Sequence, residues 1–134
     1  MELESGAKLR GRVETIHHTG SEITQIVRAL QGFLRLRNDP PRRLWLAQAA
    51  EEAVSLVRLV SPTPDVEVSA RAKAQPQVHE APSAVAAGLV DILLDALATS
   101  DRGDAIELVV SEEGAAALAA VKGGGELRLP KAGL

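Results

Sequence analysis

The sequence predicts an α+β protein with two parts, an antiparallel helical hairpin over residues 1–61 and a small α/β sandwich over residues 62–134. Three observations support this prediction. Before residue 61, apolar side chains recur in steps of three and four, the period of packed helices. The segment Ser61-Pro62-Thr63-Pro64-Asp65 then breaks the helical pattern. After this break, short stretches alternate between apolar and polar residues, as strands do.

The first helix is expected from about Leu3 to Arg37. Its seam consists of apolar or small residues: Leu9, Val13, Ile16, Gly20, Ile23, Val27, Leu30 and Leu34. Asn38-Asp39-Pro40-Pro41 predicts a turn, and a second helix is expected over about Pro41 to Val60. The stripe of this second helix is Leu46, Ala49, Ala53, Leu56 and Val60. Because a lone hairpin leaves its seam half exposed, we expect two copies to form a four-helix bundle and hence a homodimer.

The second part is expected to contain strands around one buried helix. Val66–Ala70 alternates as a strand, and Gln75–Val78 is a candidate second strand. A helix is expected from Glu80 to about Thr99, with Pro82 in its first turn. Because it is apolar on most sides, we expect this helix to be largely buried. Further strands are expected over Ala105–Val110, Ala115–Val121 and Glu126–Leu129, and His79 is expected in a loop.

Composition excludes several classes of function. The net charge of −3 argues against nucleic acid as a partner, because nucleic-acid-binding domains usually carry a basic face. No apolar run approaches the roughly 20 residues of a membrane span, and the N-terminus lacks a signal pattern. No membrane contact is therefore expected, and a cytoplasmic location is the default. The absence of cysteine excludes disulfides and thiolate metal sites. The sequence predicts no metal site and no cofactor.

Two adjacent histidines, His17 and His18, lie on the first predicted helix. His17 follows the seam residue Ile16 and therefore flanks the predicted core, whereas His18 lies closer to solvent. A histidine at the edge of a bundle is accessible to another protein, as phosphoryl transfer through imidazole requires. A shared metal site is disfavoured, because neighbouring positions diverge by about 100° around a helix. The alternative for His17 is an ordinary solvated residue.

The order of elements resembles that of a bacterial sensor histidine kinase core. The phospho-acceptor motif of these kinases has histidine, an acid one residue later, a polar residue four later, and apolar residues six and nine later. From His17 these positions hold His18, Ser21, Ile23 and Ile26, so only the acidic position departs. The asparagine-box helix of the kinase ATPase domain resembles Leu89-Val90-Asp91-Ile92-Leu93-Leu94-Asp95-Ala96, with Asp91 and Asp95 at the two asparagine positions. The resemblance covers about residues 10–125.

The departures from the kinase pattern concern ATP. The second asparagine of the kinases helps hold Mg²⁺, and here Asp95 adds negative charge at that position. The Asp-x-Gly-x-Gly loop that receives adenine is replaced by Val121-Lys122-Gly123-Gly124-Gly125. Little chain remains after it for a lid and a second glycine motif. The resemblance therefore implies a degenerate kinase core in which Asp91 and Asp95 mark a vestigial nucleotide site, and no ATP-dependent kinase activity is expected.

The resemblance implies a histidine phosphotransferase, which relays phosphoryl groups between the receiver domains of response regulators in two-component signalling. His17 is the expected acceptor, and His18 is the fallback. Ser21, one turn later, either positions an attacking water or the incoming aspartyl phosphate, or is a small solvent-facing residue. The alternative function is a non-catalytic dimeric docking module that binds a receiver or a kinase. An active ATP-dependent kinase ranks third.

A basic end of the hairpin is the predicted partner-binding surface. It includes Arg28, Arg35, Arg42 and Arg43, whose charge would complement the acidic pocket of a receiver domain. For Arg35 the alternative is a helix-end charge favoured by the helix dipole. The alternative for Asp91 and Asp95 is that they are ordinary helix residues, since carboxylates four residues apart are common on any helix.

Overall fold

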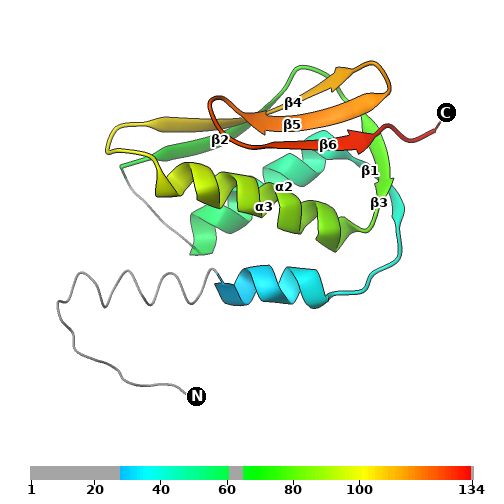
Figure 1. Cartoon of the computed structure of the whole chain (residues 1–134), viewed down its shortest axis with the longest axis horizontal. Coiled ribbons are helices and arrows are strands. Elements are labelled where there is room, and N and C mark those ends of the chain that lie inside the picture. Colours follow the sequence, from blue (N-terminus) through cyan, green and yellow to red (C-terminus); the bar gives the residue numbers. More distant parts are fainter. Residues whose placement is uncertain (1–27, 61–64, 134) are drawn as a thin grey trace.

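The computed structural model describes residues 28–60 and 65–133. Within these ranges the chain is a mixed α+β structure with a helix over residues 28–36, two longer helices and two sheets. Figure 1 shows three layers: the larger sheet, the helices α2 (Leu46–Val60) and α3 (Pro82–Ala98), and then the helix over 28–36 on the far side of α3. The predicted α+β class is confirmed.

The larger sheet has four strands in the order β2-β4-β5-β6. They are β2 (Glu67–Ala72), β4 (Ala105–Glu113), β5 (Ala116–Val121) and β6 (Glu126–Pro130). β2 runs parallel to β4, whereas β4, β5 and β6 pair antiparallel through tight turns. All four strands lie where the sequence predicts them, within three residues at each end. The alanine-rich segment of β5 forms a strand because it pairs with β4 on one side and with β6 on the other.

The core lies between this sheet and α2 and α3. On β4, Ile106, Leu108 and Val110 alternate inward, and on β5 Ala117 and Ala119 do the same. Helix α3 is the buried helix that its composition predicts, and its fully buried residues include Leu89, Val90 and Leu93. On α2 the buried residues are Leu46, Ala50, Ala53, Val54 and Val57. The predicted stripe of α2 shares only Leu46 and Ala53 with this buried set.

The second predicted helix begins later than expected, and residues before it form a strand. β1 (Arg42–Trp45) pairs antiparallel with β3 (Gln77–Glu80) in a two-stranded ribbon. The prediction of a helix from Pro41 is therefore wrong, and α2 starts at Leu46. The physical reason is tertiary pairing: β3 supplies the hydrogen-bonding partner that residues 42–45 lack locally. His79 lies on β3 and not in a loop.

The described residues do not show the predicted helical hairpin or four-helix bundle. Helix α2 contributes its apolar face to the core that it shares with α3 and the sheet. The seam residues Leu30 and Leu34 of the preceding helix also pack against this core. The core therefore extends across residue 61, which the sequence predicts as a domain boundary.

Candidate functional site

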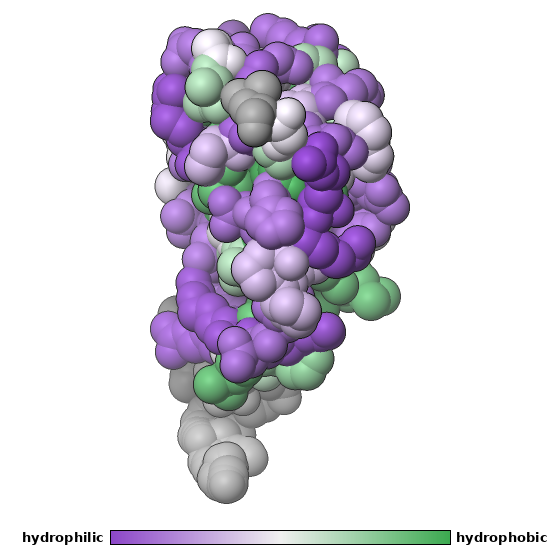
Figure 2. Space-filling view, turned by 90° about the vertical axis from the view of Figure 1, so that its right-hand side faces the viewer, coloured by the Kyte–Doolittle hydropathy of each residue, from purple (hydrophilic) through white to green (hydrophobic). Residues whose placement is uncertain are grey.

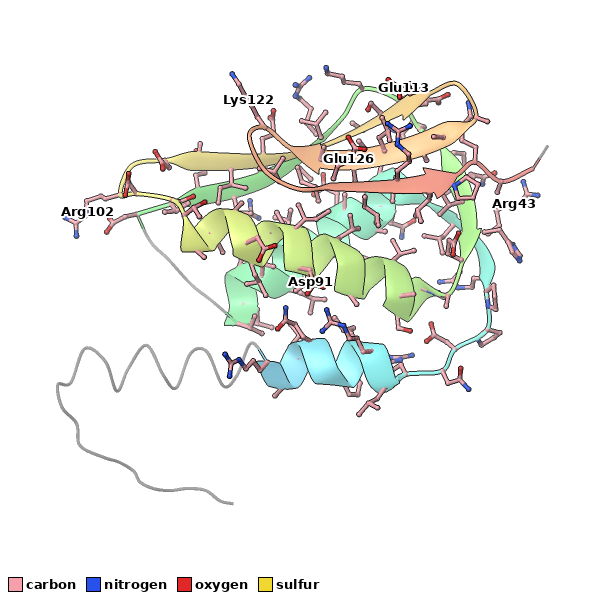
Figure 3. The ribbon with its side chains drawn as sticks, viewed as in Figure 1. Arg43, Asp91, Arg102, Glu113, Lys122 and Glu126 are labelled. Atoms are coloured by element: carbon pink, nitrogen blue, oxygen red, sulfur yellow. The ribbon has the colours of Figure 1, made fainter. Side chains whose placement is uncertain are left out.

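Helix α3 carries both residues of the predicted vestigial nucleotide site, and the structure gives them different surroundings. Asp91 turns toward the helix over 28–36, where Gln31 Nε2 donates to its Oδ1 at 2.6 Å. Arg35 donates to the other oxygen, Oδ2, and forms an ion pair with it. Figure 3 shows Asp91 on the side of α3 that faces this helix. Asp91 therefore binds the preceding helix through both carboxylate oxygens.

Asp95 lies one turn further along α3, in a hollow at the end of the sheet. The hollow has a volume of about 370 Å³. It is lined by Asp95, Ala96, Thr99, Ser100, Asp104, Ala105, Ile106, Val121, Lys122, Gly123 and Gly124. The structure thus brings together Asp95 and the glycine segment after β5, which the sequence predicts as two parts of one former site. Two carboxylates and one ammonium group line it, so its formal charge is negative.

The glycine segment of this hollow is a short closed turn. Residues 122–125 are the only residues between the end of β5 at Val121 and the start of β6 at Glu126. Gly124 N donates to the carbonyl of Val121 at 2.9 Å, and Val121 N donates to that of Gly125 at 3.2 Å. Gly123 has a φ of 74°, which favours glycine. Because β6 pairs directly with β5, no lid segment is inserted between these strands.

A second side-chain contact fixes the linker between the first helix and β1. Asp39 accepts hydrogen bonds from Ser83 N at 3.0 Å and from Ser83 Oγ. Ser83 is in the first turn of α3, so the carboxylate caps this helix from a distant part of the chain. The hydrogen bonds from Ser83 lower the pKa of Asp39 below its ordinary value. A depression of about 490 Å³ between Asp39 and Asp91 separates this contact from the first one.

The predicted basic surface is divided in the structure. Arg28 lies at the start of the described helix and Arg35 near its end, where it pairs with Asp91. Arg42 and Arg43 are exposed on β1, beyond the linker. Arg43 Nη1 donates to Gln77 Oε1 at 3.3 Å. Only Arg42 and Arg43 are neighbours, and Arg35 instead holds the helix on α3.

The predicted phosphotransfer residues His17, His18 and Ser21 lie outside the described residues. Sequence reasoning missed the roles of Gln31, Asp39 and Ser83. Aspartate often caps the helix that follows it in the chain. The helix that Asp39 caps is instead α3, through Ser83, which lies 44 residues away. Over the described residues, no group of three or more metal-ligating side chains gathers. In the same ranges, no helix is long and apolar enough to cross a membrane.

No protein-family model and no curated protein matches the sequence. Solved structures do match it. The cytoplasmic segment of histidine kinase QseC superposes with a TM-score of 0.53 at 15% identity, over 84% of this chain and 75% of that one. A histidine kinase from Burkholderia phymatum STM815 superposes with a TM-score of 0.54 at 20% identity, over 86% of this chain and 55% of that one. The chain therefore has a fold related to that of histidine kinases.

Proposed function

We propose that this protein is a dimeric histidine phosphotransferase that relays phosphoryl groups between receiver domains in two-component signalling. The observation that carries the proposal is the closed turn at residues 122–125 within a histidine-kinase-related fold. In a fold whose relatives are kinases, the position of a nucleotide lid is reduced to four residues. The fold argues for phosphoryl chemistry, and the short turn argues against ATP as the phosphoryl donor.

The charges around the hollow support the same conclusion. A nucleotide polyphosphate there would meet the carboxylates of Asp95 and Asp104, with Lys122 as the one lysine among the lining residues. At about 4 Å, two like charges repel by roughly 4 kcal/mol at the effective dielectric constant of a protein surface. Asp91 is engaged by Gln31 and Arg35 on another side of α3. A phosphorylated receiver is therefore the better phosphoryl donor.

The proposed reaction needs only a positioned imidazole. A ring nitrogen of His17 attacks the phosphorus of an aspartyl phosphate in line, the bond from phosphorus to the aspartate oxygen breaks, and the carboxylate leaves. An aspartate of a second receiver then attacks the phosphohistidine and regenerates the imidazole. His17 supplies the nucleophile, and because the transition state of phosphoryl transfer is loose, positioning and electrostatic stabilisation account for most of the remaining catalysis. Ser21 is proposed to orient the phosphoryl group.

Dimerisation through the N-terminal helix is part of the proposal. Leu30 and Leu34 are packed against the core of the same chain. Phe33 and Leu36, on another side of this helix, are 57% and 85% exposed. These two residues supply an apolar surface next to the predicted seam, and a second copy would remove it from water.

The test is phosphotransfer with histidine variants. The protein is incubated with a phosphorylated receiver, and we expect acid-labile, base-stable phosphate to appear on it. The substitution His17→Gln should abolish labelling, whereas His18→Gln should leave some. The reverse pattern would place the acceptor at His18. Labelling of neither the wild type nor the variants, together with retained receiver binding, would favour the non-catalytic docking module.

A further inference from the structure

The ribbon of β1 and β3 presents an outer face that the core does not use. Side chains alternate along a strand, so Leu44 and Val78 face the core while their neighbours face away. The register sets Arg43 opposite His79 and Trp45 opposite Gln77. These four residues form the outer ribbon face. Trp45 is the only tryptophan of the chain and is 46% exposed.

Arg43 is one of the basic side chains of the described residues that form no ion pair with a carboxylate. Six basic side chains form ion pairs with carboxylates: Arg35, Arg37, Arg71, Arg102, Arg128 and Lys131. Over the described residues, Arg43 forms none, and its one side-chain hydrogen bond is to the neutral Gln77. Figure 3 shows Arg43 at the end of the molecule, pointing away from the body. A carboxylate from another molecule is the natural partner of this guanidinium.

The ribbon is also fixed before any partner arrives. Leu46 N donates to the carbonyl of Pro76 at 3.1 Å, and Ala132 N donates to that of Gln77 at 2.7 Å. The C-terminal segment adds a bridge between Lys131 and Val78. β3 is therefore held by β1 on one side and by residues 131–132 on the other. A fixed surface loses little conformational entropy on binding.

From these observations we propose that the outer ribbon face docks an acidic surface of a receiver domain, with Trp45 as the apolar anchor and Arg43 as the charge contact. Tryptophan and arginine are the residues that most often dominate binding energy at interfaces. The choice of a receiver rests on the proposed function. The acidic chemistry of the partner rests on Arg43.

The same features argue against two other occupants. Figure 2 views the end of the molecule that carries the ribbon, and its surface is mainly hydrophilic, with apolar atoms in a crevice and at the margins. A lipid surface would require a broader apolar area. In a symmetric dimer the same patch meets itself, so each Arg43 would need a carboxylate on the outer ribbon face of the other copy, and that face includes none. Like charges across an interface oppose such pairing.

The test measures binding of isolated receiver domains from the same genome, activated with beryllofluoride, by calorimetry with the full chain. We expect Arg43→Glu and Trp45→Ala each to raise Kd at least about tenfold, and Trp45→Phe to have a smaller effect. Arg102→Glu is the matched charge-reversal control, because Arg102 is exposed at the opposite end of the molecule (Figure 3). It should leave Kd unchanged. Circular dichroism checks that each variant is folded.

Several outcomes would overturn the docking proposal. Receiver binding that is unchanged in both Arg43→Glu and Trp45→Ala would refute it and leave the proposed phosphotransfer function standing. Dissociation of a dimer by Trp45→Ala, seen by sedimentation, would make the ribbon an interface between copies instead. Binding that depends on the ribbon without any phosphotransfer would support docking and refute the phosphotransferase function. Absence of binding to every receiver would refute both.

Discussion

Replacing Asp91 with alanine is expected to loosen the helix over residues 28–36 from α3 while the sandwich of sheet, α2 and α3 stays folded. Asp91 accepts from Gln31 at 2.6 Å and pairs with Arg35. The side chains of Arg35 and Asp91 are 54% and 34% exposed, so solvent screens their attraction. An ion pair of this exposure contributes about 0.5 kcal/mol. The part-buried hydrogen bond from Gln31 adds about 1 kcal/mol.

The expected loss is thus about 1.5 kcal/mol in the free energy of opening this helix, or roughly a tenfold fall in amide protection. Hydrogen exchange read by mass spectrometry measures it, with the peptide over residues 28–36 compared against peptides from β4 and β5. The matched control is Asp95→Ala, one turn away on the same helix. Over the described residues the Asp95 carboxylate forms no hydrogen bond or ion pair, so protection there should be unchanged.

A double-mutant cycle separates the ion pair from the hydrogen bond. Arg35→Ala combined with Asp91→Ala should show a coupling of about 0.5 kcal/mol, because each single change already breaks the pair. Equal protection of the helix in the wild type and in Asp91→Ala would refute the assignment of Asp91 as its anchor. The same refutation would follow if Asp95→Ala had the larger effect.

Three further predictions concern other contacts. The hydrogen bonds from Ser83 lower the pKa of Asp39 in the folded protein, so the contribution of Asp39 to stability is complete above its ordinary pKa of 3.8 and is lost as pH falls through the folded-state pKa. The urea midpoint should therefore fall less between pH 5 and pH 2 in Ser83→Ala than in the wild type. An equal fall in both proteins would contradict this prediction. Leu34→Ala, at a buried position, should cost about 2 to 3 kcal/mol of the opening free energy of the helix over 28–36, whereas Leu36→Ala should cost almost nothing by hydrogen exchange. Phe33→Asp should dissociate the proposed dimer in light scattering, because Phe33 lies on the exposed apolar surface that a second copy would cover; a wild type that is already monomeric at micromolar concentration would remove the claim.

Most elements of the sandwich follow from local pattern. Alternation marks β2 and β4, and the apolar composition of α3 predicts its burial. The alanines of β5 favour helix by propensity, yet their place in a tight hairpin after β4 predicts a strand correctly. In these cases the signal lies within the segment itself or in the adjoining turn, so the element can be predicted without knowing a distant partner.

The errors arise where distant segments meet. β1 forms because residues 77–80 pair with it, and no periodicity within Arg42–Trp45 indicates that partner. A hairpin partner would bury one side of α2, but the sheet and α3 determine which residues of α2 are buried. For the site, sequence reasoning grouped Asp91 with Asp95. The structure separates them because Gln31 and Arg35 reach Asp91 from 56 or more residues away.

Phosphotransfer can be separated from kinase activity by offering the wild-type protein two phosphoryl donors in parallel, radiolabelled Mg-ATP and a radiolabelled phosphorylated receiver domain. We predict that radiolabelled phosphate passes to the protein from the receiver and that none passes from ATP. Calorimetry should detect no binding of Mg-ATP at sub-millimolar concentration. The closed turn at residues 122–125 and the carboxylates of the hollow are the physical reasons for the second part. Label from ATP, or micromolar affinity for it, would refute the proposed phosphotransferase and favour an active ATP-dependent kinase.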